Sequence, residues 1–180
     1  ICADLGAEVV KVEAPEGDSS RYPGVPRNRG MSGSFQHNNR GKRSLCLDLK
    51  QPRARDAILR LARTADAFMS NIRPAALERR GLGYEALRAE NPGIVYLSMV
   101  GYGSRGRYAG RPAYDDLIQA ASGVPMLFAR NGGEPRFIPM AAIDRLVGSA
   151  AANALLAGLL AKARTGVGQR LHSGSGSDGP

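Results

Sequence analysis

The stretch AFMSNIRPAALERRGLGYEALRAENPGIVYLSMVGYG, residues 67–103, decides the fold class of this chain. Its ends, 67–72 and 93–103, are short apolar runs bounded by Gly or Pro, a composition typical of buried strands. Between them, 74–80 and 84–90 have the composition of two short helices. A strand, a helical crossover and a second strand predict a parallel pair, because parallel strands need a long connection.

The same alternation continues on both sides of this stretch. We predict further strands over 7–13 and 44–50, further helices over 53–65, 114–122 and 144–164, and loops over 15–42 and 104–113. Strands that alternate with helices predict an α/β fold with an open, mostly parallel sheet and flanking helices. Ligand sites in such sheets gather at the carboxyl ends of the strands, so we expect binding residues in the segments that follow them.

The longest uncharged run is LVGSAAANALLAGLLA, residues 146–161. It is shorter than the roughly 20 apolar residues that span a bilayer, and it contains Ser149 and Asn153. Its many Ala and Gly residues would allow a close approach to other elements. We therefore expect a buried helix and no membrane span.

The chain is strongly basic, with 25 Lys and Arg against 16 Asp and Glu and an isoelectric point near 10.1. The net charge of +9 favours an anionic partner, such as nucleic acid, a membrane surface or a phosphorylated cofactor, or else reflects a solvated arginine-rich surface. The two cysteines, Cys2 and Cys46, provide no disulfide framework, which favours a reducing, cytoplasmic location. No Cys/His cluster has the spacing of a metal site, so we predict no metal.

The sequence patterns at both ends of the chain predict a domain that is cut short. Residues 1–13 have no Met start and no signal-peptide pattern, and they begin inside an apolar pattern, so we expect upstream sequence to be missing. At the other end, GQRL (168–171) is a plausible start of another strand. We interpret the linker-like residues after it, 172–180, as an engineered or artefactual tail that follows a partial domain over 1–171.

Common catalytic motifs do not occur in the sequence. There is no G-x-x-x-x-G-K-[ST] phosphate loop and no G-x-S-x-G nucleophile elbow. GYGSRG (101–106) precedes Tyr108 and Pro112, whereas a dinucleotide-binding loop would precede a helix. What remains is Asp144, in IDRLVG (143–148), at the start of the long apolar helix. An acidic residue there is either a helix cap or, in a dry setting, a nucleophile toward an acyl group.

Six segments follow one another along the chain: LGAEVVKVEAPEGDSSR, NRGKRSLCLDLK, ADAFMSNIRPAALERRGLGYEAL, NPGIVYLSMVGYGSRGRYAGRPAYD, QAASG and TGVGQRL. They cover almost all of residues 3–171 and resemble the family III CoA-transferases. That family includes formyl-CoA transferases, carnitine-CoA transferases and α-methylacyl-CoA racemases. The resemblance implies a Rossmann-like large domain, a small second domain, and two chains interlocked as a homodimer.

The resemblance also implies a chemistry and a set of contacts. In this family an aspartate attacks an acyl-CoA thioester, giving a mixed anhydride and free CoA thiolate, and the thiolate then captures the enzyme-bound group before the acceptor acid takes over. Asp144 matches that aspartate in position. The contacts to CoA carry over to Arg21, Leu47, Lys50, Asn71, Ile72, Arg79 and Tyr102. Acyl-CoA and carboxylic acids are therefore the expected substrates. Because family members are much longer than this chain, we expect the chain alone to bind CoA weakly and to catalyse little.

Two other functions remain open. The racemase subgroup resembles this chain but has G-H-D where this sequence has Ala113-Tyr114-Asp115. A tyrosine phenol ordinarily titrates near pH 10 and is a poor general base at neutral pH, so the motif favours transfer over racemisation. A basic binding module, for example for RNA, would explain the positive charge. However, the six Tyr and four Phe residues show none of the spacing of a base-stacking surface, so nucleic acid is the less favoured partner.

Overall fold

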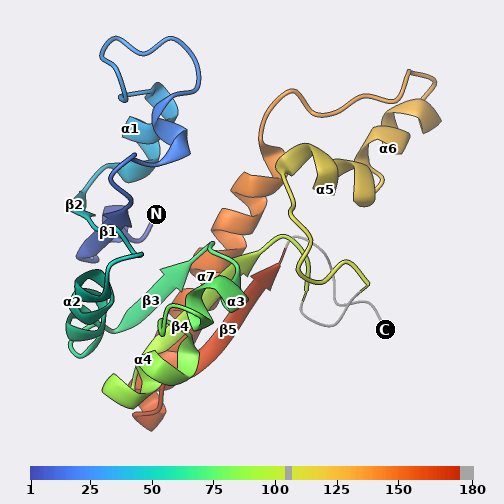
Figure 1. The fold of residues 1–180 in the computed structure, drawn as a ribbon. Helices are drawn as coiled ribbons and strands as arrows, with labels where there is room; N and C mark the ends of the chain where they lie inside the picture. Colours follow the sequence, from blue (N-terminus) through green and yellow to red (C-terminus); the bar gives the residue numbers. More distant parts are fainter. Residues whose placement is uncertain (104–106, 175–180) are drawn as a thin grey trace. The chain divides into compact units, whose positions relative to one another are not determined.

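The computed structural model describes residues 1–103 and 107–174. The chain divides into two compact units, Ile1–Ile58 and Leu59–Pro180, and each is described by itself. Figure 1 shows the helices and strands of both units, coloured along the sequence. All described strand pairs are parallel, so the predicted α/β class with parallel strands is confirmed; the strands form two sheets, one in each unit.

The first unit is built on two parallel strands. β1 (Val9–Glu13) pairs with β2 (Lys42–Cys46), with Glu13 opposite Cys46 at their carboxyl ends. The other elements are η1 (Ala3–Leu5), η2 (Ser19–Arg21), α1 (Gly33–Asn39) and the first part of α2 (Pro52–Ala62). Because the two strands are parallel, the segments that follow them leave from the same edge of the sheet.

The helix α1 lies inside the segment 15–42, which was predicted to be a loop. Ser32 is the N-cap of α1, and its hydroxyl accepts a hydrogen bond from the amide of Phe35 at 3.0 Å. The side chain of Phe35 is buried. The loop prediction was wrong here because a serine cap and a single buried aromatic residue stabilise a helix that is too short to show an apolar stripe.

The strand β2 ends four residues before the end of the predicted strand over 44–50. The carboxylate of Asp48 accepts a hydrogen bond from the amide of Lys50 at 2.9 Å, and the amide of Gln51 donates to the carbonyl of Asp48 at 2.9 Å. These bonds make a turn, and Pro52 begins α2 directly after it. Lys50 therefore stands in a turn that follows the strand.

The second unit contains a three-stranded parallel sheet in the order β3–β4–β5. Its strands are β3 (Ala67–Ser70), β4 (Val95–Val100) and β5 (Gln169–Gly174). Its helices are α3 (Pro74–Glu78), α4 (Tyr84–Glu90), α5 (Asp115–Ala121), α6 (Val124–Arg130) and α7 (Ala142–Thr165). The central strand, β4, is the most deeply buried of the three.

Helices cover both faces of this sheet. On β4, Tyr96 contacts Tyr84 of α4, with 5.7 Å between the ring centroids. Side chains alternate across a strand, so the neighbouring Val95 points to the opposite face. There, Val95 and Leu171 lie against Gly158 of α7. The two helices α4 and α7 therefore cover opposite faces, and α7 packs along β4 and β5 (Figure 1).

Two elements of the second unit differ from the prediction. Helix α6 was not predicted, because its apolar residues Met126, Leu127 and Phe128 are all exposed and form no buried stripe. Strand β5 begins at GQRL as expected, but it continues to Gly174, which pairs with Val100. Residues 175–180 of the predicted tail lie outside the described residues.

Among the described residues, α7 is the one helix that is long and apolar enough to cross a membrane by length and composition. Helices in the cores of soluble proteins pass the same test. One side of α7, which includes Ala151, Leu155 and Gly158, is buried, as expected. Leu146 and Leu160 on the same helix are exposed, so the helix is buried on one side only.

Candidate active site

Asp144 lies in the first turn of α7, but it does not cap the helix. The N-cap position is Ala141, which offers no side-chain hydrogen bond, and Asp144 is the third helical residue. The helix-cap interpretation of Asp144 is therefore wrong. Its carboxylate is also exposed in the described chain, which corrects the expectation of a dry setting.

The cap of α7 comes from Asp115, the first residue of α5. Its Oδ1 accepts a hydrogen bond from the backbone amide of Asp144 at 2.9 Å. The backbone amides of Ile143 and Ala142 also favour the charged form of this carboxyl group, although the Ala142 amide itself donates to the carbonyl of Met140 at 2.7 Å. Desolvation favours the neutral form of Asp115, but these bonds and one from the side chain of Gln119 outweigh it. The pKa of Asp115 is therefore lowered, and the group is a carboxylate at neutral pH.

The two carboxyl groups have opposite pKa shifts. Desolvation and then the negative charge of Asp115 raise the pKa of Asp144 above its ordinary value. A carboxylate with a raised pKa is more basic and more nucleophilic than a free one. Two neighbouring acids whose pKa values are driven apart are a common arrangement at functional sites.

A pocket of about 410 Å³ opens beside Asp144. It is lined by Tyr114, Asp115, Asp116, Gln119, Phe137, Ile138, Met140, Ala141 and Asp144. The lining therefore combines carboxyl groups with apolar side chains from α5 and from the segment that leads into α7. Within residues 1–103 and 107–174, no group of three or more His, Cys, Asp or Glu side chains could hold a metal ion.

The other sequence-predicted residues of the second unit follow the strands. Asn71, Ile72 and Arg79 are exposed; the first two come directly after β3, and Arg79 ends α3. Tyr102 follows β4, is half-buried, and packs on Tyr108 with 5.4 Å between ring centroids. Asn71 and Ile72 thus follow the carboxyl end of β3 and Tyr102 follows that of β4, whereas Arg79 is separated from β3 by α3.

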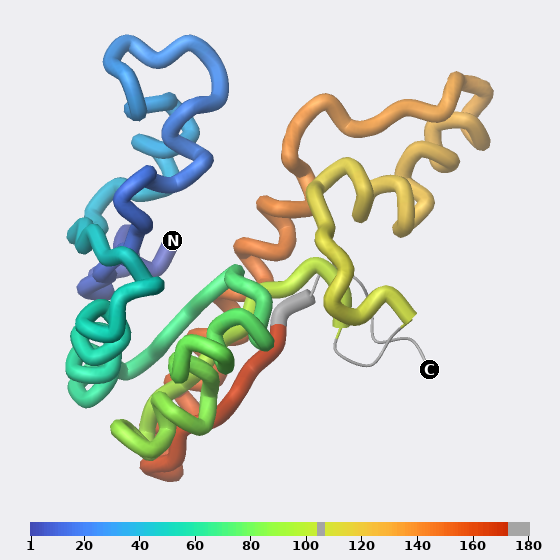
Figure 2. The backbone as a smooth tube through the Cα atoms, in the orientation of Figure 1, coloured from blue at the N-terminus to red at the C-terminus, as the bar shows by residue number. Residues whose placement is uncertain are grey.

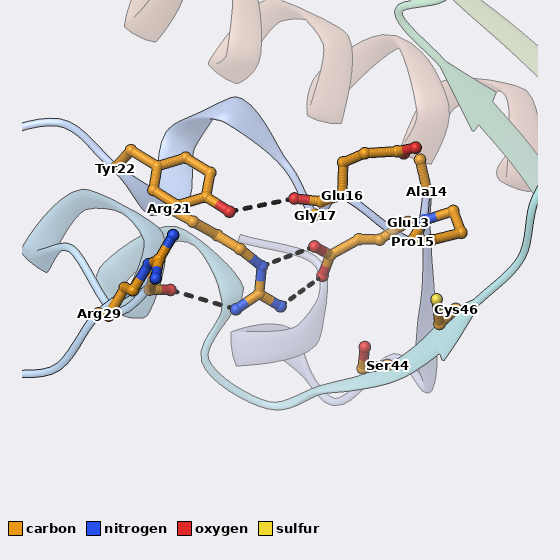
Figure 3. Close-up of a pocket in the computed structure, with 11 residues that line it drawn as sticks. Glu13, Ala14, Pro15, Glu16, Gly17, Arg21, Tyr22, Arg29, Ser44 and Cys46 are labelled. Carbon is orange, nitrogen blue, oxygen red and sulfur yellow. Dashed lines mark hydrogen bonds and ion pairs between the residues drawn. The ribbon is translucent and has the colours of Figure 1, made fainter.

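In the first unit, Arg21 is held in place by Glu13, a partner that the sequence did not reveal. Its Nε and one terminal nitrogen donate to the two carboxylate oxygens of Glu13 at 2.8 and 3.0 Å, as the dashed lines in Figure 3 show. The other terminal nitrogen donates to the carbonyl of Gly30 at 3.2 Å. The guanidinium also lies 3.8 Å from the ring centre of Phe35. The hydrogen bonds from Arg21 lower the pKa of Glu13, whereas its burial raises that pKa. The hydrogen bonds are the larger effect, so the pKa of Glu13 is lowered overall.

A pocket of about 300 Å³ lies beside this ion pair (Figure 3). Its lining includes Glu13, Arg21, Tyr22, Arg29 and Cys46, from β1, η2, the loop after it and β2. The two remaining predicted residues follow β2: Leu47 is half-buried and bonds through its amide to the carbonyl of Glu13 at 2.8 Å, while Lys50 is exposed. Cys46 is a free, exposed thiol and Cys2 is free and half-buried.

The loop that carries Arg21 has a testable pH dependence through Asp18. Partial burial favours the neutral acid, but the ion pair with Lys11 and the hydrogen bonds from Ser20 outweigh it and lower the pKa of Asp18 to about 2. The folded-state pKa is below the ordinary 3.8, so this stabilisation is fully present above pH 3.8 and is lost as the pH falls toward 2. In an NMR titration, we expect the Asp18 carboxyl carbon to have a midpoint near 2. A midpoint at 3.8 or above would contradict the ion pair.

An α/β unit whose longest helix begins at an exposed carboxylate of raised pKa, beside a pocket, is typical of an enzyme that uses a carboxylate as base or nucleophile. The family model of CoA-transferase family III matches residues 1–175. The chain belongs to this family.

Curated relatives and solved structures agree with this assignment. The chain is 39% identical over 172 residues to "Probable fatty acyl-CoA transferase Rv3272" of Mycobacterium tuberculosis, a match that covers 93% of this chain and 43% of that protein. It is 38% identical over 176 residues to the succinate–glutarate CoA-transferase of Agrobacterium fabrum, covering 94% of this chain and 44% of that protein. The crystal structure of Rv3272 superposes with a TM-score of 0.88 at 37% identity, over 97% of this chain and 49% of that one. The crystal structure of a CAIB/BAIF family protein from Brucella suis superposes with a TM-score of 0.87 at 38% identity, and the match covers 94% of this chain and 46% of that one. The chain thus spans less than half the length of these relatives.

Proposed function

We propose that the protein of which this chain is a part is a CoA-transferase that moves CoA between carboxylic acids, with Asp144 as its nucleophile. The observation that carries the proposal is the carboxylate of Asp144, which lines a pocket at the first turn of α7 with a raised pKa. Membership of CoA-transferase family III supports it. An interlocked homodimer, a cytoplasmic location and the absence of a membrane anchor belong to the same proposal.

The proposed reaction consists of four acyl exchanges. An Asp144 oxygen attacks the thioester carbon of the donor, the C–S bond breaks, and CoA leaves as a thiolate, which gives a mixed anhydride. The thiolate then attacks the Asp144 carbonyl carbon and releases the donor carboxylate, leaving an aspartyl-CoA thioester. The acceptor carboxylate attacks that thioester and frees the thiolate again. The thiolate finally attacks the acceptor carbonyl, which yields the new acyl-CoA and restores the carboxylate of Asp144.

The chemistry makes a demand on the surroundings of Asp144. Water must be kept from the anhydride, because hydrolysis would end each cycle without transfer. The exposure of Asp144 in this chain suits the proposal that other parts of a family-length protein complete the site. We also propose that the 180-residue chain alone has little turnover for this reason.

We propose that the CoA nucleotide is held by the residues that the family resemblance assigns. The nitrogens of Arg21 donate to Glu13 and Gly30 and one face of the guanidinium lies on Phe35, so the opposite face, and not the hydrogen-bonding edge, would meet the adenine. Lys50 and Arg79 are exposed cations suited to phosphate oxygens. Leu47, Asn71, Ile72 and Tyr102 would contact the rest of CoA. A phosphorylated partner of this kind also accounts for part of the net charge of +9.

The proposal is tested by trapping the enzyme-bound intermediate. A family-length protein containing this chain is mixed with acyl-CoA and an acceptor acid, quenched with hydroxylamine, and digested for mass spectrometry. Hydroxylamine converts an activated aspartyl group to a hydroxamate, so we expect the modification on Asp144 in a substrate-dependent manner. Turnover that continues while Asp144 is never modified would show that another residue is the nucleophile.

A further inference from the structure

Helix α7 begins without a side-chain cap of its own, and the amide of its third residue, Asp144, is bound by a side chain from another helix. Ala141 has no side-chain oxygen, and Oδ1 of Asp115 accepts the amide of Asp144 at 2.9 Å instead. The amide of Ala142 donates to the carbonyl of Met140 at 2.7 Å. The sequence separation between Asp115 and Asp144 is 29 residues. The position of the α7 start therefore depends on a side chain from α5.

Asp115 is in turn held by Gln119, one turn further along α5. Gln119 is a polar side chain with only 1% exposure. Its amide nitrogen donates to Oδ2 of Asp115, and its amide oxygen accepts the backbone amide of Ile138 at 2.8 Å. The same nitrogen lies 3.4 Å from the carbonyls of Ile138 and Met140. A buried amide with all of its hydrogen bonds made fixes the elements that it joins.

These bonds connect three parts of the second unit: α5, the segment 131–141, and the first turn of α7. Figure 2 shows that this segment returns from α6 to the start of α7 as an extended stretch without helix or strand. An extended stretch has little internal hydrogen bonding to fix its own path. Gln119 supplies that restraint at Ile138 and Met140, immediately before α7 begins.

We propose that Asp115 and Gln119 are a positioning pair for Asp144: Asp115 fixes the first turn of α7, and Gln119 fixes both Asp115 and the segment that enters the helix. The inference rests on the proposed role of Asp144 as nucleophile. A nucleophile must be held within a fraction of an ångström of its line of attack, so loss of either residue acts on the chemical step and not on CoA binding.

The charge of Asp115 gives the pair a second effect. The charged and titratable groups around Asp144 are Tyr114, Asp115 and Asp116 in the pocket lining, and Arg145 next to it on α7. After desolvation, the negative charge of Asp115 is what raises the pKa of Asp144. The rate falls at low pH as Asp144 becomes protonated. The pH of this acidic limb is therefore set partly by Asp115.

Three variants of a family-length protein separate these effects. We expect Asp115→Ala to lower kcat by about 10²-fold with the KM for acyl-CoA changed by less than about threefold, because the α7 start is released. Asp115→Asn keeps an oxygen acceptor for the amide of Asp144 but loses the charge. We expect it to retain more of kcat than Asp115→Ala and to move the acidic limb to lower pH. Gln119→Leu keeps volume but breaks the bonds to Asp115 and Ile138, and we expect about a tenfold loss in kcat.

The control is Glu85→Gln, which removes an exposed first-turn carboxylate from α4. It should leave kcat and the pH profile unchanged. If Asp144 is trapped by hydroxylamine but all three variants keep the wild-type kcat and acidic limb, the positioning inference is overturned while the proposed function stands. If Asp144 is not the trapped residue, the proposed function fails first, whatever the variants do. If Asp115→Ala does not fold, the Asp115→Asn variant still tests the inference, because the acidic limb of its pH–rate profile should move to lower pH.

Discussion

Replacement of Asp144 by alanine in a family-length protein is expected to lower kcat for CoA transfer by at least about 10³-fold, because the covalent route loses its nucleophile. The first exchange requires a carboxylate oxygen at this position, and of the described residues that line the pocket, Asp144 is the one that carries a carboxylate on α7. Formation of the product acyl-CoA, followed by liquid chromatography between pH 6 and 8, measures the effect.

Two comparisons separate loss of chemistry from loss of binding. The affinity for free CoA, measured by calorimetry, should change by less than about threefold, because the residues assigned to the nucleotide are elsewhere in the chain. Asp144→Asn keeps the size of the side chain but not its charge, so it should be nearly as inactive as Asp144→Ala. A turnover within tenfold of the wild type for both variants would mean that Asp144 is not the nucleophile.

The sequence could locate Asp144 but not its surroundings. Its position at the start of a long apolar helix was visible from the run IDRLVG, and the family resemblance gave it a role. Its hydrogen-bonded partner Asp115 comes from another helix. Periodicity and local cap rules describe contacts within a few residues, so a cap contributed from 29 residues away leaves no local signal. A local rule therefore assigned the cap to Asp144 itself.

The fold could be predicted where one pattern governs a whole element. Helix α4 was predicted over Tyr84–Glu90, as observed, because its apolar spacing and its Gly and Pro boundaries agree. The ends of β1, β3 and β4 were also found to within three residues. Short helices such as α1 and α6 could not be found in this way, since α1 depends on a single buried Phe35 and α6 has no buried residue.

The nucleotide-contact predictions show the same limit. The sequence suggested that Arg21 lies in a loop after a strand, where its charge would be free for a ligand. In the structure its hydrogen-bonding edge is occupied by Glu13, which is 7% exposed and ends β1. Glu13 ends an apolar strand pattern, and a buried acid at such a position needs a partner, so the sequence could have indicated Glu13. The arginine that pairs with Glu13 is set by how the segment after β1 folds back over the end of that strand, which the sequence alone does not reveal.

A close backbone approach at Gly168 predicts that Gly168→Ala strongly destabilises the second unit. A Cβ at Gly168 would lie 2.2 Å from the carbonyl oxygen of Ile94 and 2.6 Å from the carbonyl carbon of Gly93. All the crowded atoms are backbone, so no side chain can rotate away. The amide of Gly168 also donates to the carbonyl of Pro92 at 3.1 Å, which holds this turn against the start of β4.

Relief of that overlap would require β5 to move away from β4 at the position where Gln169 pairs with Val95, a residue with 0% exposure. We expect Gly168→Ala to lower the free energy of unfolding of the 180-residue chain by about 3 kcal/mol in urea denaturation. The matched control is Gly148→Ala inside α7, where a Cβ would meet no atom within 4 Å. Because Gly weakens a helix interior, that control should stabilise the chain by about 0.5–1 kcal/mol. Equal midpoints for the two variants would show that β5 does not approach β4 as closely as described, and α7, which leads into β5, would then lose the support that places Asp144.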